Sequence, residues 1–218
     1  MPPFLPYAPR NQDGDAKGGS LPPVNTFPGA VIGREDAYHP STGDYPKGGT
    51  GQTLDKVKCA KQMFINRYHI HFYLGVISNG KQVALPLAIG MVNPGTVTNG
   101  FVNTASCYYY LHTHDESGIV HVEVPKNAPF TKPLYKLGTL FKVWGINVAA
   151  TQFAHFHGPM HVFVGNVPLE QTTVTSYAPL KGKLEDLEIY SHEVVWIEIG
   201  TTYYKSKHLP PVTFYMEY

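Results

Sequence analysis

Charged residues are scarce in this sequence. Lys, Arg, Asp and Glu make up 15% of its 218 residues, whereas about a quarter is usual for a globular protein. The 17 basic and 16 acidic residues nearly cancel, and no run of basic residues could follow a phosphate backbone. Nucleic acid is therefore not an expected partner.

Long apolar runs are also lacking. No stretch approaches the roughly 18 apolar residues of a membrane-spanning helix, so we expect no transmembrane segment. Residues Met1 to Pro6 show neither the charged start nor the apolar centre of a signal peptide. The sequence fits a cytosolic protein or a mature form whose export segment has been removed.

Cysteine occurs only twice, at Cys59 and Cys107. Their separation excludes a Cys-x-x-Cys redox or zinc motif. Two interpretations stay open. The cysteines are either buried free thiols or one disulfide, which would stabilise the fold by about 3–4 kcal/mol and would indicate an oxidising compartment.

Several catalytic signatures are missing. The sequence contains no Gly-x-Ser-x-Gly, phosphate-binding loop, dinucleotide fingerprint or His-Glu-x-x-His. No motif arranges an Asn or Asp partner for a Cys–His nucleophile at Cys107. None of these enzyme classes is therefore predicted.

Residues 1–53 differ in composition from the rest. They contain nine prolines and nine glycines, which is typical of loops rather than of a packed core. We expect an extended arm without a sheet of its own, followed by one domain over residues 54–218. The arm would be held on this domain or on other protein chains by its apolar residues: Phe4, Leu5, Tyr7, Leu21, Val24, Phe27, Val31 and Ile32.

The domain is rich in strand-forming residues. Aromatics make up 13% of the chain, and aromatic and β-branched residues gather in short runs separated by turn signals. Asn79-Gly80 predicts a hairpin that pairs Tyr68–Ser78 with Lys81–Met91 and sets His71 opposite Ala88. The other predicted strands are Tyr108–His114, Ile119–Val124, His161–Gly165, Glu188–Gly200 and Val212–Tyr218.

One segment instead has helical spacing. Leu134, Leu137, Phe141 and Trp144 fall on one helical face, with Thr131 as a cap, Pro133 in the first turn and Gly145 at the end. We therefore predict a mainly β fold, an antiparallel β-sandwich or barrel-like domain, with one short amphipathic helix and a long irregular N-terminal arm.

Histidine pairs point to a metal. The motif His-x-His occurs three times, at His69/His71, His112/His114 and His155/His157, and His121 and His161 lie nearby. Residues two apart on a strand face the same side, so each pair would present two imidazoles, which are ligands of Zn, Cu, Ni and Fe. We expect His39, His192 and His208 to be structural residues.

A second hairpin, formed by Tyr108–His114 and Ile119–Val124, would bring more ligands to one of these pairs. If residues 115–118 form its loop, His112 lies opposite His121, and His114 opposite Ile119. His112, His114, His121 and Glu123 would then share one face, provided that no bulge intervenes. The candidate metal ligands are His69, His71, His112, His114 and His121, and the expected ion is a divalent transition metal, copper or zinc.

Three strings support a family resemblance. YHIHF at residues 68–72, LHTHDESGIVHVE at 111–123 and LGTLFKVWG at 137–145 resemble a family of uncharacterised bacterial exported β-rich proteins. The likeness covers roughly residues 59–218. It implies export to a periplasmic or extracellular location and favours pairing Cys59 with Cys107, but it implies no activity.

A weaker similarity is local. His155 to His161 matches a His-x-His-x-x-x-His string of multicopper oxidases, in which a cysteine ligand of the blue copper stands where this sequence has Phe156. That difference excludes a blue copper site through this string. The similarity favours copper as a candidate ion.

Three functional hypotheses follow. The first is an exported copper- or zinc-binding protein. The second is an accessory or structural subunit of a larger assembly, including a membrane-associated one, held by its N-terminal arm. The third is a small metalloenzyme, which requires an open coordination position that no sequence pattern can reveal.

Overall fold

The computed structural model describes residues 48–61, 66–126, 128, 135–168 and 170–214, with the side chains of residues 66 and 67 left out. All eight apolar residues expected to anchor the arm lie outside these ranges, as does His39. Within the described residues, no helix has the length and apolar character needed to cross a membrane. The predicted mainly β fold is confirmed, and its sheets are open.

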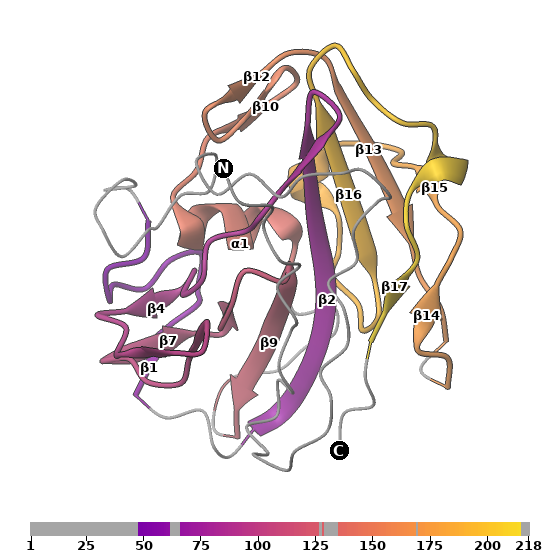
Figure 1. Ribbon diagram of the computed structural model, residues 1–218. Helices are drawn as coiled ribbons and strands as arrows, with labels where there is room; N and C mark the ends of the chain where they lie inside the picture. The colour runs from indigo at the N-terminus through magenta and orange to yellow at the C-terminus, as the bar shows by residue number, and fades with distance from the viewer. Residues whose placement is uncertain (1–47, 62–65, 127, 129–134, 169, 215–218) are drawn as a thin grey trace.

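A seven-stranded sheet forms the centre of the domain (Figure 1). Its strand order is β15-β13-β16-β2-β9-β8, and the short β3 pairs with β2. The strands are β2 (Asn66–Ser78), β3 (Lys81–Val83), β8 (Leu111–His112), β9 (Ile119–Pro125), β13 (Met160–Gly165), β15 (Ala178–Pro179) and β16 (Val194–Ile199).

The long strand β2 organises this sheet. It pairs antiparallel with β9 along one edge and parallel with β16 along the other. All other pairs in the sheet are antiparallel. The single parallel pair brings the C-terminal β16 beside β2, although more than a hundred residues separate them.

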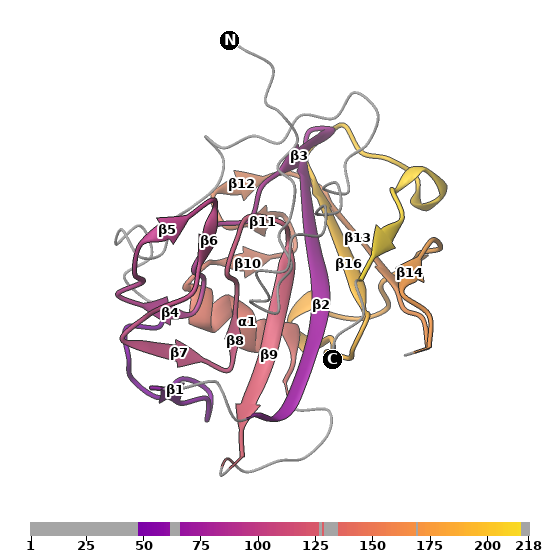
Figure 2. The ribbon, with the colours of Figure 1, turned by 60° about the horizontal axis from the view of Figure 1, so that its bottom comes forward.

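One face of the sheet packs on the only α-helix of the described residues, α1 (Leu137–Trp144). Figure 2 shows α1 behind β8 and β9. Ile70, Phe72 and Leu74 of β2 belong to the same buried cluster as Leu137 and Leu140 of the helix. Because alternate residues of a strand face opposite sides, His69, His71 and Tyr73 lie on the other face.

Apolar side chains cover one end of that other face. Tyr73, Ile119 and Trp196 join a second buried cluster with Val212 and Phe214, which lie near the C-terminus. Farther along the same face, His69 and His71 of β2 lie opposite Glu123 and His121 of β9. The face is therefore aromatic at one end and rich in imidazoles at the other.

Short strands complete the structure. They form one sheet in the order β1-β7-β4, another in the order β10-β11-β12, and the pairs β5–β6 and β14–β17. Their bounds are β1 (Cys59–Ala60), β4 (Met91–Val92), β5 (Val97–Thr98), β6 (Phe101–Val102), β7 (Cys107–Tyr109), β10 (Val148–Ala149), β11 (Gln152–Phe153), β12 (Phe156–His157), β14 (Thr173–Val174) and β17 (Val212–Thr213), and the 3₁₀ helices are η2 (Leu184–Asp186) and η3 (Ser206–His208).

A disulfide joins Cys59 of β1 to Cys107 of β7. The two strands also pair directly, with Cys59 opposite Tyr109. The disulfide that the family resemblance favours is thus confirmed, and no free cysteine is present among the described residues.

The first predicted hairpin is right at its turn and wrong beyond it. Asn79 and Gly80 have the positive φ angles of such a turn, but β3 ends at Val83. The rest of that edge of β2 pairs with β9, so His71 lies opposite His121 rather than Ala88. Pro86 cannot donate to a ladder, and Ala88 has a φ of 62°, which is incompatible with a strand.

The helix and two strands are shorter than predicted. Lys136 is extended and forms a bridge with Glu188, so α1 begins at Leu137; Thr131 and Pro133 lie outside the described residues. The helix ends as expected at Gly145, which has a φ of 86°. The strand predicted from Glu188 begins only at Val194, because His192 has a φ of 56°. The last strand, β17, covers Val212–Thr213, and residues 215–218 are not described.

The end of the predicted arm contacts the domain. The backbone N–H of Gly49 donates to the carbonyl of Val143 on α1, over 2.8 Å. The hydroxyl of Tyr109 donates to the carbonyl of Gln52 and accepts from the N–H of Gly51. The predicted domain boundary after residue 53 remains a prediction.

Removing the disulfide should destabilise the domain. The bond closes a loop of 48 residues, and the lost chain-entropy constraint predicts a fall of about 3–4 kcal/mol in the free energy of unfolding when both cysteines are changed to serine. Urea denaturation of the double variant measures this. The reduced wild type should lose a similar amount, and a loss below about 1 kcal/mol in both would contradict the prediction.

Gly138→Ala should also destabilise, against the usual trend for helices. Replacing a helical glycine by alanine normally stabilises by about 1 kcal/mol. Here the added Cβ would lie 2.8 Å from the carbonyl oxygen of Glu185, so η2 would have to move. We expect a lower melting temperature, whereas Lys142→Ala on the same helix, which removes an exposed ion pair with Asp55, should change it little.

Candidate metal centre

The pairing register of β2, β9 and β8 places the histidines in rows across these three strands. His71 on β2 lies opposite His121 on β9, which lies opposite His112 on β8. In the next row, His69 lies opposite Glu123. Because alternate residues share a face, all five side chains project from the same side of the sheet. The predicted pairing of His112 with His121 is confirmed.

His114 joins the group by a different route from the one predicted. The β8–β9 ladder ends at His112, so His114 does not pair with Ile119. Instead the backbone of His114 accepts a hydrogen bond from Val102 of β6. The ring of His114 stacks on Phe101, with 4.7 Å between the ring centres. The β5–β6 hairpin thus holds His114 beside His112.

On the β2 side, three imidazole nitrogens converge, and an oxygen of Glu123 lies near two of them. Nε2 of His71 lies 2.9 Å from Nε2 of His69 and 2.8 Å from Nδ1 of His121, and these last two are 3.3 Å apart. Oε1 of Glu123 lies 3.3 Å from the His69 atom and 3.4 Å from the His121 atom. Ligands of a tetrahedral ion at about 2.0–2.1 Å are roughly 3.3 Å apart, so the spacings of the three nitrogens suit a common ion.

On the β8 side, two lone pairs face each other. Nε2 of His112 and Nε2 of His114 are 3.1 Å apart. Nδ1 of His112 lies 2.9 Å from the carbonyl of Tyr109, and Nδ1 of His114 lies 2.6 Å from that of Val102. A carbonyl only accepts, so both Nδ1 atoms carry the proton and both Nε2 atoms are bare in the neutral rings. This backbone-fixed tautomer is typical of metal-ligating histidine.

Burial keeps these rings neutral. His112 is fully buried, and His121 is 2% exposed. Desolvation, reinforced by His114, lowers the pKa of His112 to about 3, and desolvation lowers the pKa of His114 to about 4. The pKa of His121 is also lowered, by burial first and by the neighbouring histidines next. A proton is therefore a poor bridge between the facing nitrogens at neutral pH.

Two groups of side chains could hold a metal ion. One comprises His112, His114, His121 and Glu123, and the other His69, His71 and His121; within each group the ligand atoms lie within 4.8 Å of one another. All five candidate ligands predicted from the sequence are brought together, along with Glu123. Pairing of β2 with β9, which joins the two groups, was not predicted, because no local signal in the sequence specifies it.

The remaining histidines stand apart. His155, His157 and His161 belong to neither group. His157 is exposed, and His161 stacks on Tyr203 with ring centres 4.0 Å apart. His192, expected to be structural, stacks on Phe214 and hydrogen-bonds through Nδ1 to the carbonyl of Gln171.

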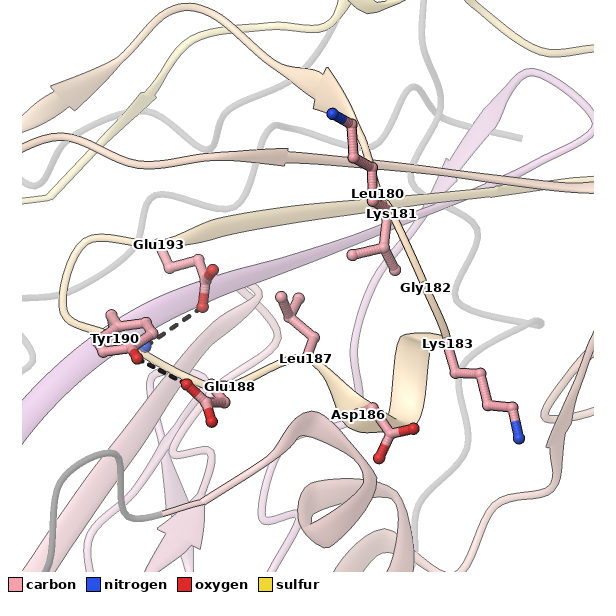
Figure 3. Close-up of a pocket in the computed structure, with 9 residues that line it drawn as sticks. All are labelled: Leu180, Lys181, Gly182, Lys183, Asp186, Leu187, Glu188, Tyr190 and Glu193. Atoms are coloured by element: carbon pink, nitrogen blue, oxygen red, sulfur yellow. Dashed lines mark hydrogen bonds between the residues drawn. The ribbon is translucent and has the colours of Figure 1, made fainter.

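A separate hollow of about 550 Å³ is lined by residues between 180 and 193 (Figure 3). The hydroxyl of Tyr190 donates to Glu188, and the backbone N–H of Tyr190 donates to Glu193. Burial raises the pKa of the Glu193 carboxyl to about 7. None of the six residues of the two metal-binding groups lines this hollow, so it is distinct from the metal centre.

Comparison with protein-family models, with curated proteins and with solved structures finds no match to this chain. The resemblance to a bacterial exported family stays a prediction from the sequence strings. The case for function therefore depends on the geometry of the histidine cluster.

Acidification should destabilise the metal-free protein through the buried histidines. An unfolded histidine has a pKa near 6.5, whereas the pKa is about 3 for folded His112 and about 4 for folded His114. Between these values the unfolded chain binds more protons. The free energy of unfolding should therefore fall as the pH falls from about 6.5 to 4, by at most about 1.4 kcal/mol per pH unit for each histidine.

Two buried carboxyls change the free energy of unfolding with pH in the opposite direction. Burial raises the pKa of Glu193 and of Glu198 to about 7. Each of these carboxyls therefore lowers the free energy of unfolding as the pH rises from about 4.5 to 7. His112→Gln separates the effects, because the variant keeps both carboxyls. Urea denaturation at pH 7 and pH 4.5, with a chelator present, should show a larger loss of stability for the wild type than for the variant; equal losses would refute the prediction.

Proposed function

We propose that this protein is an exported metal-binding protein that holds a divalent transition ion, copper or zinc, through His69, His71, His112, His114, His121 and Glu123. The observation that carries the proposal is the pair of bare nitrogens, His112 Nε2 and His114 Nε2, which lie 3.1 Å apart and of which the His112 ring is fully buried. Two facing lone pairs repel each other unless a cation lies between or beside them, and burial disfavours a proton there.

The donor set supports copper or zinc. It consists of imidazole nitrogens and a carboxylate, which suit Zn(II) and Cu(II), whereas Cu(I) favours thiolate and thioether ligands. The two cysteines are joined to each other and supply no thiolate. At equal availability, Cu(II) should bind more tightly than Zn(II).

The arrangement favours holding an ion over catalysis. On the β8 side, the imidazoles of His112, His114 and His121 and the carboxylate of Glu123 can complete a four-coordinate shell from the protein alone. A catalytic zinc site keeps one position for water or substrate. Export is supported by the disulfide, which is typical of oxidising compartments, and by the family resemblance of the sequence.

Elemental analysis tests the proposal. Protein purified without a histidine tag, incubated with Cu(II) or Zn(II) and freed of excess ion, should retain at least one ion per chain. The bound ion should raise the melting temperature, because it binds the folded state selectively. His71→Gln and His112→Gln should each lower metal retention.

The matched control is His157→Gln, which alters an exposed histidine outside the cluster. It should retain as much metal as the wild type. If the wild type retains no ion and its melting temperature does not respond to either metal, the proposed function is wrong.

A further inference from the structure

We infer that the cluster holds two metal ions, with the imidazole of His121 bridging them. The inference rests on the proposed function and specifies how many ions the site takes. It starts from the number of donors: six side chains converge, whereas one Zn(II) ion in a tetrahedral site uses four.

The donors are divided between the two sides of His121. On the β2 side, Nε2 of His69 and Nε2 of His71 lie close to each other. On the β8 side, Nε2 of His112 and Nε2 of His114 do the same. His121 is the only histidine present in both groups, and β9, which carries it, lies between β2 and β8 in the sheet.

Strand spacing keeps the two sides apart. Neighbouring strands are about 4.8 Å apart, so the β2 and β8 backbones are separated by roughly 10 Å with β9 between them. The ring centre of His121 lies 4.0 Å from that of His71 and 5.5 Å from that of His112. Two ions, one on each side of the His121 ring, fit this layout better than a single central ion.

His121 differs from its neighbours in a way that suits a bridge. In His112 and in His114, Nδ1 donates to a backbone carbonyl, so only Nε2 of each ring can bind a metal ion. Among the described residues, no carbonyl hydrogen-bonds to the His121 ring; its Nδ1 contacts only His69, His71 and Glu123. The bridge therefore assigns Nδ1 to the ion on the β2 side and Nε2 to the ion on the β8 side.

Binding of two ions by the His121 ring requires no further reactant. A neutral imidazole has one bare nitrogen and one N–H. When both nitrogens bind an ion, the ring gives its N–H proton to solvent and becomes an imidazolate. Glu123, which belongs to the His112 group and also contacts His69, has two oxygens and can serve either ion.

Copper stoichiometry tests the inference on the full chain. After loading with Cu(II) and removal of excess, two ions per chain are expected. One ion per chain would overturn the inference and leave the proposed function intact, whereas none would refute both.

The bridge has its own test. Electron paramagnetic resonance of the loaded wild type should show fewer than two spins per chain, because an imidazolate couples the unpaired electrons of the two ions. Two ions with two independent spins would overturn the bridge. This measurement uses the unmodified protein and does not depend on a variant that folds poorly.

Paired variants test the division of the donors. His69→Gln/His71→Gln and His112→Gln/His114→Gln should each retain about one ion per chain, with a full one-spin signal. Loss of all metal in either double variant, with the fold intact by circular dichroism, would contradict two separable sites.

Discussion

The antiparallel pairing of β2 with β9 is the constraint on which the candidate metal centre depends. Its register sets His71 opposite His121 and His69 opposite Glu123. A shift of one residue would turn the ligands of the shifted strand to the face that packs on α1. Apolar residues at the alternate positions, such as Ile70, Phe72, Val120 and Val122, belong to the main core and hold the register in place.

The same sheet therefore carries two different environments. On one side, burial of large apolar side chains against α1 provides the driving force for folding, at roughly 25 cal/mol per Å² of apolar surface. On the other side, imidazoles with opposed lone pairs are buried at a cost. A bound cation would offset that cost and would couple metal binding to stability.

The periphery contributes the orientation of individual ligands. The carbonyl of Tyr109 fixes the His112 tautomer, and Tyr109 follows the disulfide by two residues and pairs with Cys59. The β5–β6 hairpin fixes His114 through Val102 and Phe101. Small strands that look incidental to the fold thus fix the orientation of the candidate metal ligands.

Much of this could be predicted from local sequence patterns. The mainly β class, the turn at Asn79-Gly80, the end of the helix at Gly145 and the placement of His112 opposite His121 all follow from interactions between residues close in the chain. Turn geometry and the two-residue period of a strand act over such short distances. Two of the His-x-His pairs, together with His121 from the predicted hairpin register, likewise identify the five candidate ligands without any knowledge of the fold.

Tertiary structure decided how those pieces combine. The hairpin predicted beyond β3 gave way because Pro86 and Ala88 do not suit a strand and because β9 occupies that edge of β2. That long-range pairing, about fifty residues apart in the chain, joins His69 and His71 to the other ligands. Burial and backbone carbonyls then set which nitrogens are bare. Such contacts depend on packing across the whole sheet, and the residues that make them carry no local signal of their partners.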